Sequence, residues 1–399
     1  MRLNLYRLDI PFKQHFKHSS ADRAKTESVW VEARGNGCQG FGEGCPRSYV
    51  TGEDLASAKA FFGRHADTLS AKIGSVEDLK RWVDDHREDI DRNPAVCCAM
   101  ELAILELLAR CRGVSVEELL GLRAVTELFR YSAVIGDGLG AEFRLLARRF
   151  GDSGFTDFKI KLSGKLASDR EKMAILDGLG LEGLHVRVDA NNLWDRPRTA
   201  ARYITEMGRS LVGALVGIEE PIAVGQFDAM RQIWQETGIP IILDESLLRS
   251  EEIAALADDP QCWIINVRVS KMGGLIRSLK LVGEAEKAGI PVIVGAQVGE
   301  TSLLTRAGLI VAEAAGTNLY GHEGAFGTLL LKSDVVTPPL MFGGEGILDS
   351  GAWRFASKSG WGLTWKFDDD IRALGADGES ILGGTTKLLI PSARAKAAE

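Results

Sequence analysis

Basic and acidic residues end a series of short apolar segments in the second part of the chain. One such segment ends in Lys159-Ile160-Lys161, and the three that follow end in the acidic residues Asp189, Glu219 and Asp244. Because alternate residues of a strand point to the same side, both lysines would lie on one face. If the segments are parallel barrel strands, their carboxyl ends meet at one mouth. The pattern therefore predicts acid–base chemistry beside a cation site.

Three converging carboxylates would repel each other in a medium of low dielectric constant, and a divalent cation would relieve that repulsion. Oxygen ligands with open positions suit Mg²⁺, or Mn²⁺ in its place. A lysine has a reference pKa near ~10.4, too high for a base at neutral pH, but a neighbouring cation lowers it. Lys161, next to Lys159 and the metal, is the predicted base for a proton adjacent to a substrate carboxylate. The metal would stabilise the enediolate that results.

Each motif also has a structural interpretation. A Lys-x-Lys pair is often a solvated strand edge, Glu219-Glu220-Pro221 suits the end of a loop, and Asp244-Glu245-Ser246 suits a helix N-cap. The order of the motifs on consecutive strand ends favours the chemical interpretation.

Eight β-rich segments alternate with helical stretches over residues 128–337, and their starts lie 23 to 29 residues apart. They are Arg130–Ile135, Asp157–Leu162, His185–Asp189, Ala214–Glu219, Pro240–Asp244, Trp263–Val269, Pro291–Gly295 and Asn318–Gly321. Regular βα units predict an α/β fold, a modified (β/α) TIM barrel that forms the catalytic domain. An open doubly wound sheet ranks second, because no Gly-x-Gly-x-x-Gly follows the first strand.

Two further regions flank the barrel. Residues 1–127 are expected to form an N-terminal α+β capping domain, with strands at 1–10 and 27–34 and helices at 53–72, 76–90 and 94–112. Gly35-Asn36-Gly37 predicts a hairpin turn. Residues 338–399 are expected to return to the capping domain, with a strand at Leu363–Phe367 and a helix starting at Asp368-Asp369-Asp370.

The composition is that of an ordinary globular protein, with 45% hydrophobic and 26% charged residues. A net charge of −7 argues against a nucleic-acid partner. No apolar run could span a bilayer and the first residues lack a signal-peptide core, so a cytoplasmic location without a membrane partner is expected. The six cysteines form no Cys-x-x-Cys pair, which argues against zinc, and are expected to be buried, reduced thiols.

Five motifs together resemble the enolase superfamily, and within it the muconate-lactonizing-enzyme (muconate cycloisomerase) subgroup. They are Lys159-Ile160-Lys161, Asp189-Ala190-Asn191, Glu219-Glu220-Pro221, Asp244-Glu245-Ser246 and Lys271-Met272-Gly273-Gly274. The resemblance covers nearly the whole chain. It implies Asp189, Glu219 and Asp244 as Mg²⁺ ligands and Lys161 as the acid/base lysine, modulated by Lys159. It also implies supporting roles around the metal for Asn191, Glu245 and Glu300.

One position departs from that subgroup, which has a second catalytic lysine three residues before Lys271. This chain has Arg268 there. An arginine is effectively always protonated and is a poor base, although it can hold a carboxylate or an enediolate. Lys271 is the candidate to replace the missing lysine. Its side chain would point to the opposite side of the strand from that of Arg268, and it is expected at the edge of a loop. With Lys161 alone, the resemblance implies cycloisomerisation or syn-elimination of a small organic acid, as catalysed by an isomerase or a lyase.

Two alternatives stay open: a racemase or epimerase of an amino-acid derivative, and a metal-binding pseudoenzyme in which Arg268 marks lost catalysis. Dipeptide epimerases tend to carry Asp-x-Asp at strand eight, where this chain reads Gly321-His322-Glu323-Gly324. Mandelate racemases have a histidine at strand seven, where Gln297 stands. Both positions depart from those branches.

Substrate contacts are expected from two capping loops and from the barrel. The loops lie around Phe12–Lys25 and Pro46–Thr51 and would contribute His18 and Tyr49. Gln297 and His322 are the barrel candidates. The predicted partner is a small carboxylate, and family analogy predicts a homo-oligomer.

Overall fold

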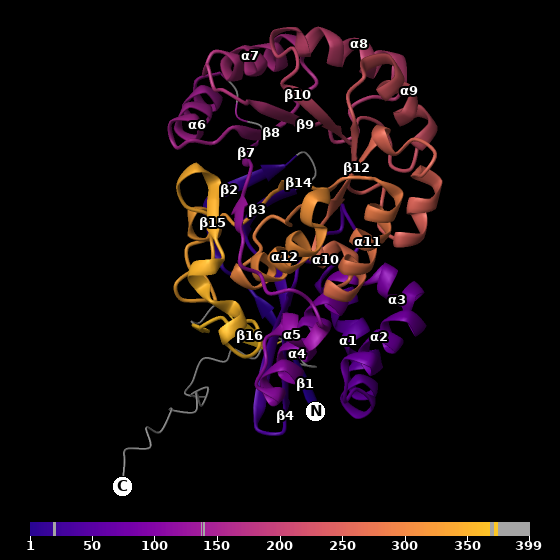
Figure 1. The fold of residues 1–399 in the computed structure, drawn as a ribbon, viewed down its shortest axis with the longest axis vertical. Helices are drawn as coiled ribbons and strands as arrows, with labels where there is room; N and C mark the ends of the chain where they lie inside the picture. The colour runs from indigo at the N-terminus through magenta and orange to yellow at the C-terminus, as the bar shows by residue number, and fades with distance from the viewer. Residues whose placement is uncertain (19–20, 137, 139, 368–370, 374–399) are drawn as a thin grey trace.

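Eight parallel strands form one curled sheet in the computed structural model (Figure 1), which describes residues 1–18, 21–136, 138, 140–367 and 371–373. The strands are β7 (Ala133–Ile135), β8 (Asp157–Lys161), β9 (His185–Asp189), β10 (Leu215–Glu219), β11 (Ile241–Leu243), β12 (Trp263–Val267), β13 (Val292–Val294) and β14 (Leu319–His322). Each lies in one of the eight predicted segments or reaches one residue beyond it. Their order in the sheet follows the chain. The two edges of the sheet meet where the Ser132 N–H donates to the His322 carbonyl at 2.8 Å.

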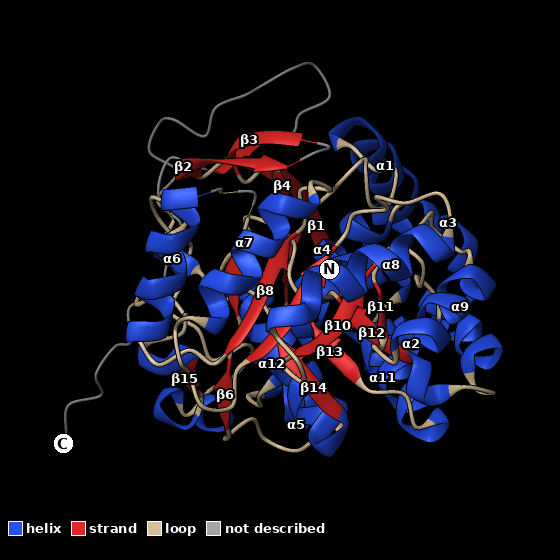
Figure 2. Ribbon diagram, turned by 90° about the horizontal axis from the view of Figure 1, so that it is seen from above, coloured by secondary structure: helices blue, strands red, loops and turns tan. Residues whose placement is uncertain are grey.

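Helices connect the strands and cover the outside of the sheet (Figure 2). They are α6 (Gly140–Asp152), α7 (Leu166–Asp177), α8 (Pro197–Met207), α9 (Phe227–Thr237), α10 (Val269–Met272), α11 (Leu275–Ala288) and α12 (Ser302–Ala315). Parallel neighbours need such crossovers, because the chain must return to the same edge before each new strand. The α/β barrel prediction is confirmed.

The N-terminal part combines an antiparallel sheet with five helices. The sheet has the order β16-β1-β4-β5, with β1 (Arg2–Leu8), β4 (Ser28–Gly35), β5 (Cys38–Gly44) and β16 (Ile371–Ala373). The helices are α1 (Leu55–Lys72), α2 (Val76–Asp85), α3 (Arg87–Arg92), α4 (Pro94–Arg112) and α5 (Val116–Leu120). Asn36 and Gly37, at φ 49° and 74°, make the predicted turn between β4 and β5.

Two local predictions in this part need correction. The helix expected over 76–90 is interrupted at His86, whose φ of −114° and ψ of 22° lie outside the helical region and separate α2 from α3. The loop expected around Phe12–Lys25 instead contains a hairpin of β2 (Pro11–His18) and β3 (Ala21–Lys25). Cross-strand pairing provides the backbone hydrogen bonds that the local composition did not indicate.

The C-terminal segment returns to the N-terminal sheet, as predicted. β16 pairs with β1, and the Trp361 indole donates to the Phe41 carbonyl at 3.3 Å. Leu363–Phe367 is not a strand. Its Trp365 forms one isolated bridge with Val336 and packs its ring against Trp30. The predicted helix start at 368–370 lies outside the described residues, and β16 follows directly.

A short ladder ties the same segment to the start of the barrel, where β15 (Ile347–Asp349) pairs with β6 (Leu128–Arg130). The domain boundaries at 127 and 337 stay predictions.

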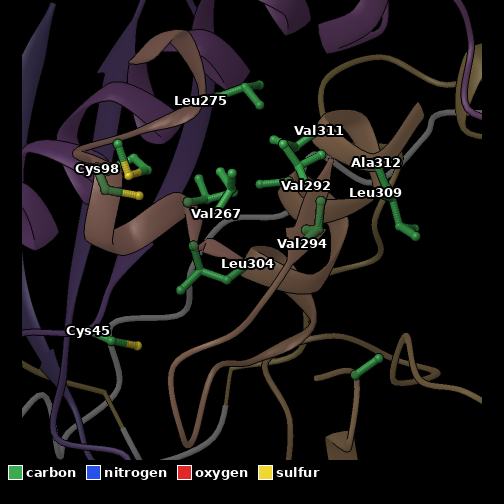
Figure 3. Close-up of a cluster of buried hydrophobic side chains, with 14 of the residues drawn as sticks. Cys45, Cys98, Val267, Leu275, Val292, Val294, Leu304, Leu309, Val311 and Ala312 are labelled. Carbon is green, nitrogen blue, oxygen red and sulfur yellow. The ribbon is translucent and has the colours of Figure 1, made fainter. Parts of the chain in front are cut away.

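One large apolar cluster joins the capping elements to the barrel. Figure 3 shows Cys98 of α4 near Val267 of β12 and Leu304 of α12. No helix in the described part of the chain has the length and apolar character needed to cross a membrane. Four of the six cysteines are buried, whereas Cys38 is half-buried and Cys111 is exposed, so the expectation of buried thiols is wrong for these two.

Candidate active site

Three buried carboxylates occupy adjacent strand ends, as predicted. Asp189 ends β9, Glu219 ends β10 in register with it, and Asp244 directly follows β11. The strands have a shared direction, so their carboxyl ends bring residues about thirty positions apart to one place. The three carboxylates therefore lie on the neighbouring strand ends expected from the sequence.

Both predicted lysines of β8 face these carboxylates. The Lys159 Nζ lies 2.5 Å from a Glu219 oxygen and 3.1 Å from one of Glu323. The Lys161 Nζ lies 3.7 Å from Asp189 and donates to the Asn191 Oδ1 at 3.0 Å. Burial alone would lower the pKa of Lys159, but Glu219 and Glu323 raise it above the usual range. Lys159 is thus a fixed cation, and Lys161 is the lysine nearer to solvent.

Arg268 approaches the same carboxylates from the far side. It follows β12, pairs with Asp244, and lies 3.6 Å from Glu219. A third contact joins its guanidinium to the Gln297 Oε1, which accepts at 3.2 Å. Burial would raise the pKa of Asp244, yet Arg268 and Lys271 together hold it well below its usual range.

Lys271 is a positioning residue in this structure and does not lie at a loop edge. It is buried in α10 and donates to the Asp244 carbonyl at 2.7 Å, to the Asp244 Oδ1 at 2.8 Å and to the Asn266 carbonyl at 2.7 Å. Three acceptors match the three donors of an ammonium group. Lys271 therefore holds Asp244 in place and is not available as a second base.

The chain's own cations already compensate the three carboxylates, which the sequence-based repulsion argument did not include. Among the described residues, no three His, Cys, Asp or Glu side chains are placed as a ready ligand cluster. The donor chemistry nevertheless fits Mg²⁺, because Asp189, Glu219 and Asp244 present only hard carboxylate oxygens on neighbouring strand ends.

Glu220 is a residue of the site whose role the sequence did not reveal. Its Oε1 accepts from the N–H groups of Asp244 and Ser246, each at 2.8 Å, and its Oε2 accepts from the Ser246 hydroxyl at 2.6 Å. It has a positive φ of 42°, as does Asn191 at 45°. Non-glycine residues rarely adopt this conformation, and they cluster at functional sites. The second Glu of Glu-Glu-Pro was the available signal.

Glu323 is the second missed residue, and its neighbour His322 does not join the cluster. Glu323 accepts from Lys159 and from the buried Arg187 at 2.6 Å. Because side chains alternate along a strand, His322 points the other way and stacks on Tyr131 with 4.0 Å between ring centroids. Burial lowers the pKa of His322 to about 3, so it is neutral. A substrate contact by His322 is not supported by this geometry.

The other predicted site residues differ in how close they lie to the carboxylates. Gln297 contacts Arg268, and its N–H donates to Glu300 at 2.6 Å. Burial raises the pKa of Glu300 to about 7. Burial, and to a smaller extent the charge of Asp244, raises the pKa of Glu245 to about 8. Tyr49 packs below the Arg23 guanidinium at 5.8 Å. His18 lies in β2, and its side chain is outside the described residues.

Comparisons with known proteins agree with this fold. Residues 142–369 match the enolase C-terminal domain-like family. The L-Lys-D/L-Arg epimerase of Methylococcus capsulatus is 30% identical over 362 residues, which are 89% of this chain and 96% of that protein. The chloromuconate cycloisomerase of a Pseudomonas species is 26% identical over 325 residues, 79% of this chain and 85% of that one.

The solved structure of L-Ala-D/L-Glu epimerase from Bacillus subtilis superimposes with a TM-score of 0.80 at 23% identity, covering 92% of this chain and 99% of that one. The relatives include both epimerases and a cycloisomerase, and all of them are enzymes. The family match spans more than half of the chain, and the strand-end carboxylates lie within it. The protein is therefore an enzyme that belongs to the enolase superfamily.

Proposed function

We propose that this protein removes the proton α to the carboxylate of a small organic acid, with Lys161 as the base, in a cycloisomerisation or syn-elimination. One observation carries the proposal. Lys161 and Arg268 approach a single carboxylate cluster from β8 and from the end of β12, with three strands between them in the sheet order. An amine can take up a proton near neutral pH when its pKa is lowered, whereas a guanidinium cannot.

Asp189, Glu219 and Asp244 would hold Mg²⁺, or Mn²⁺ in its place. When bound, the metal supplies Lewis-acid stabilisation of the charge that develops on the substrate carboxylate. Lys271 and Glu220 keep Asp244 in place from two directions, through its carboxylate and its N–H. Arg268 adds a permanent positive charge that would attract and orient the carboxylate of the substrate.

Lys161 would take the α-proton onto its Nζ and then return it on the same face or pass it to a departing group. Lys159, kept charged by Glu219 and Glu323, would favour the neutral form of Lys161 by repulsion. Arg268 would steady negative charge on the opposite side without exchanging a proton. This division of labour suits a reaction that needs one base.

A racemase or epimerase is the second candidate, because the relative at 30% identity is an epimerase. That activity requires proton transfer on both faces of the α-carbon. Arg268 occupies the position opposite Lys161 in this chain, so a second proton donor would have to come from another group or from water.

Proton NMR in D₂O tests the proposal with Mg²⁺ and a panel of organic acids, N-acyl amino acids and dipeptides. We expect Mg²⁺-dependent loss of one α-proton signal, slowed by at least about 10²-fold in Lys161→Ala. Lys165→Ala, which changes an exposed lysine nearby, is the matched control and should exchange normally.

The outcome separates the candidates. Unchanged exchange in Lys161→Ala would exclude Lys161 as the base. Interconversion of both stereoisomers with deuterium incorporation would favour the epimerase. Mg²⁺ binding by calorimetry without exchange of any acid would favour a binding protein that has lost catalysis.

A further inference from the structure

The long helix α4 lies against β5 at a spacing that only glycine permits. A Cβ placed on Gly44 would come within 1.8 Å of the Ala95 carbonyl oxygen, and one on Gly42 within 1.9 Å of that of Ala99. A Cβ on Gly40 would come within 2.3 Å of the Ala103 carbonyl oxygen. Each step of two residues back along the strand matches a step of four residues forward along the helix. Side chains return to the same face every two residues in a strand and about every four in a helix.

The next step of this series pairs Cys38 with the end of α4. Two residues before Gly40 is Cys38, the first residue of β5, and the series places it beside Leu107, one helical turn before Cys111. The Cys111 Sγ contacts the Gly35 carbonyl at 3.7 Å, and Gly35 is the β4 residue in register with Cys38. The Cys38 thiol lies near enough to Cys111 to contribute to the raised pKa of the Cys111 thiol.

This pair is also the accessible one. Cys111 is exposed and Cys38 is half-buried, whereas Cys45, Cys97, Cys98 and Cys262 are all at most 1% exposed. Two neighbouring thiols that solvent can reach, on a strand and a helix in close contact, are the pair in this chain best placed for a disulfide.

We propose that Cys38 and Cys111 form a reversible disulfide when the protein meets a peroxide. One thiolate attacks a peroxide oxygen, and a sulfenic acid and one water are formed from hydrogen peroxide. The second thiol then attacks the sulfenic sulfur, forms the S–S bond and releases a second water. Each sulfur loses one electron, and a dithiol reductant restores both thiols.

The cross-link would stabilise the capping elements. It would close the chain between residues 38 and 111 and join the β4–β5 turn to the last turn of α4. Burial and the neighbouring Cys38 raise the pKa of Cys111 to about 11, so we expect slow oxidation that is faster in mildly alkaline buffer. A loop of this length gives measurable stabilisation, and we expect a Tm increase of about 3 °C or more.

Peptide mapping of the full chain tests the proposal. The reduced protein is treated with hydrogen peroxide, alkylated, digested with trypsin without reduction and compared with Cys38→Ser and Cys111→Ser. We expect a linked peptide that joins residues 35–47 to 111–112, two hydrogens lighter than the free peptides. It should be absent from both variants and should disappear after dithiothreitol.

Thiol titration of the native protein provides a second measurement. Two fast-reacting thiols should be lost on oxidation and recovered on reduction, while the chain stays monomeric on a non-reducing gel. A linked peptide in Cys38→Ser would show that Cys45, which shares the 35–47 peptide, is the partner, and would overturn the proposal. Persistence of both fast thiols after oxidation, conversion only to sulfinic acid or only chain-to-chain dimers would also overturn it.

Discussion

In the proposed mechanism, Arg268 determines whether the site has one proton-transfer group or two. Its guanidinium contacts Glu219, Asp244 and Gln297, so it lies between the carboxylates and the loop after β13. At this place it supplies charge and geometry but no proton transfer. We therefore propose that the identity of this one residue separates one-base from two-base reactions.

Replacing Arg268 by lysine tests this residue-scale interpretation. Arg268→Lys introduces an amine that can exchange a proton on the second face. We expect it to add α-proton exchange with the opposite stereoisomer of any substrate that the wild type deuterates, at a reduced overall rate. Chiral chromatography with NMR in D₂O measures both effects. Loss of all exchange without a new stereoisomer would assign Arg268 to substrate binding alone.

At the scale of elements, the glycines of Lys271-Met272-Gly273-Gly274 make room for a carboxylate from the capping part. Glu101 of α4 accepts from the Ile276 N–H at 3.0 Å, at the first turn of α11. Gly274 has a φ of 132°, and a Cβ there would lie 2.4 Å from a Glu101 oxygen. An acidic side chain at a helix start satisfies free N–H groups and favours the helix dipole.

Gly274→Ala should therefore destabilise the protein by at least about 2 kcal/mol, since it adds both backbone strain and a clash. Gly283→Ala is the matched control within α11. A Cβ there meets no atom within 4 Å, and alanine should be neutral or stabilising by up to about 1 kcal/mol. Urea unfolding compares the two. Equal stability of both variants would contradict the clash.

At the scale of the whole molecule, several carboxylates away from the strand-end cluster are buried within the capping elements or where these meet the barrel. Burial raises the pKa of Glu43 to about 8 and that of Glu53 and Glu101 to about 7, from a usual value near 4.5. The folded state therefore binds more protons than the unfolded chain between those values. The contribution of these groups to stability is present below pH 4.5 and is lost as the pH rises through about 7 to 8.

We expect a lower Tm at pH 8.5 than at pH 6.5 in metal-free buffer, measured by calorimetry. Burial lowers the pKa of His322 from 6.5 to about 3, so this residue destabilises the folded state as the pH falls below about 6.5. The comparison therefore starts at pH 6.5. Glu43→Gln, neutral at every pH, should reduce the difference in Tm, whereas the exposed Glu236→Gln should not. An unchanged difference in Glu43→Gln would show that Glu43 is ionised throughout.

Much of this molecule could be read from local patterns. The eight strands, their order and the carboxylates at three successive strand ends follow from a repeating βα unit, because strand direction and side-chain alternation are local properties. The same alternation placed Lys159 and Lys161 on one face. The pairing of β2 with β3 was not predicted, because the composition of these residues does not indicate strands and only their cross-strand hydrogen bonds define them.

What the tertiary structure decided was the partner of each charge. Lys271 of α10 donates to Asp244, and Lys159 donates to Glu323, which lies 164 residues further along the chain. His322 points away from this cluster and stacks on Tyr131. The sequence determined which chemical groups stand at the strand ends. Only the curled sheet determined which of them touch, because those distances depend on how far the barrel closes and on how the capping helices pack against it.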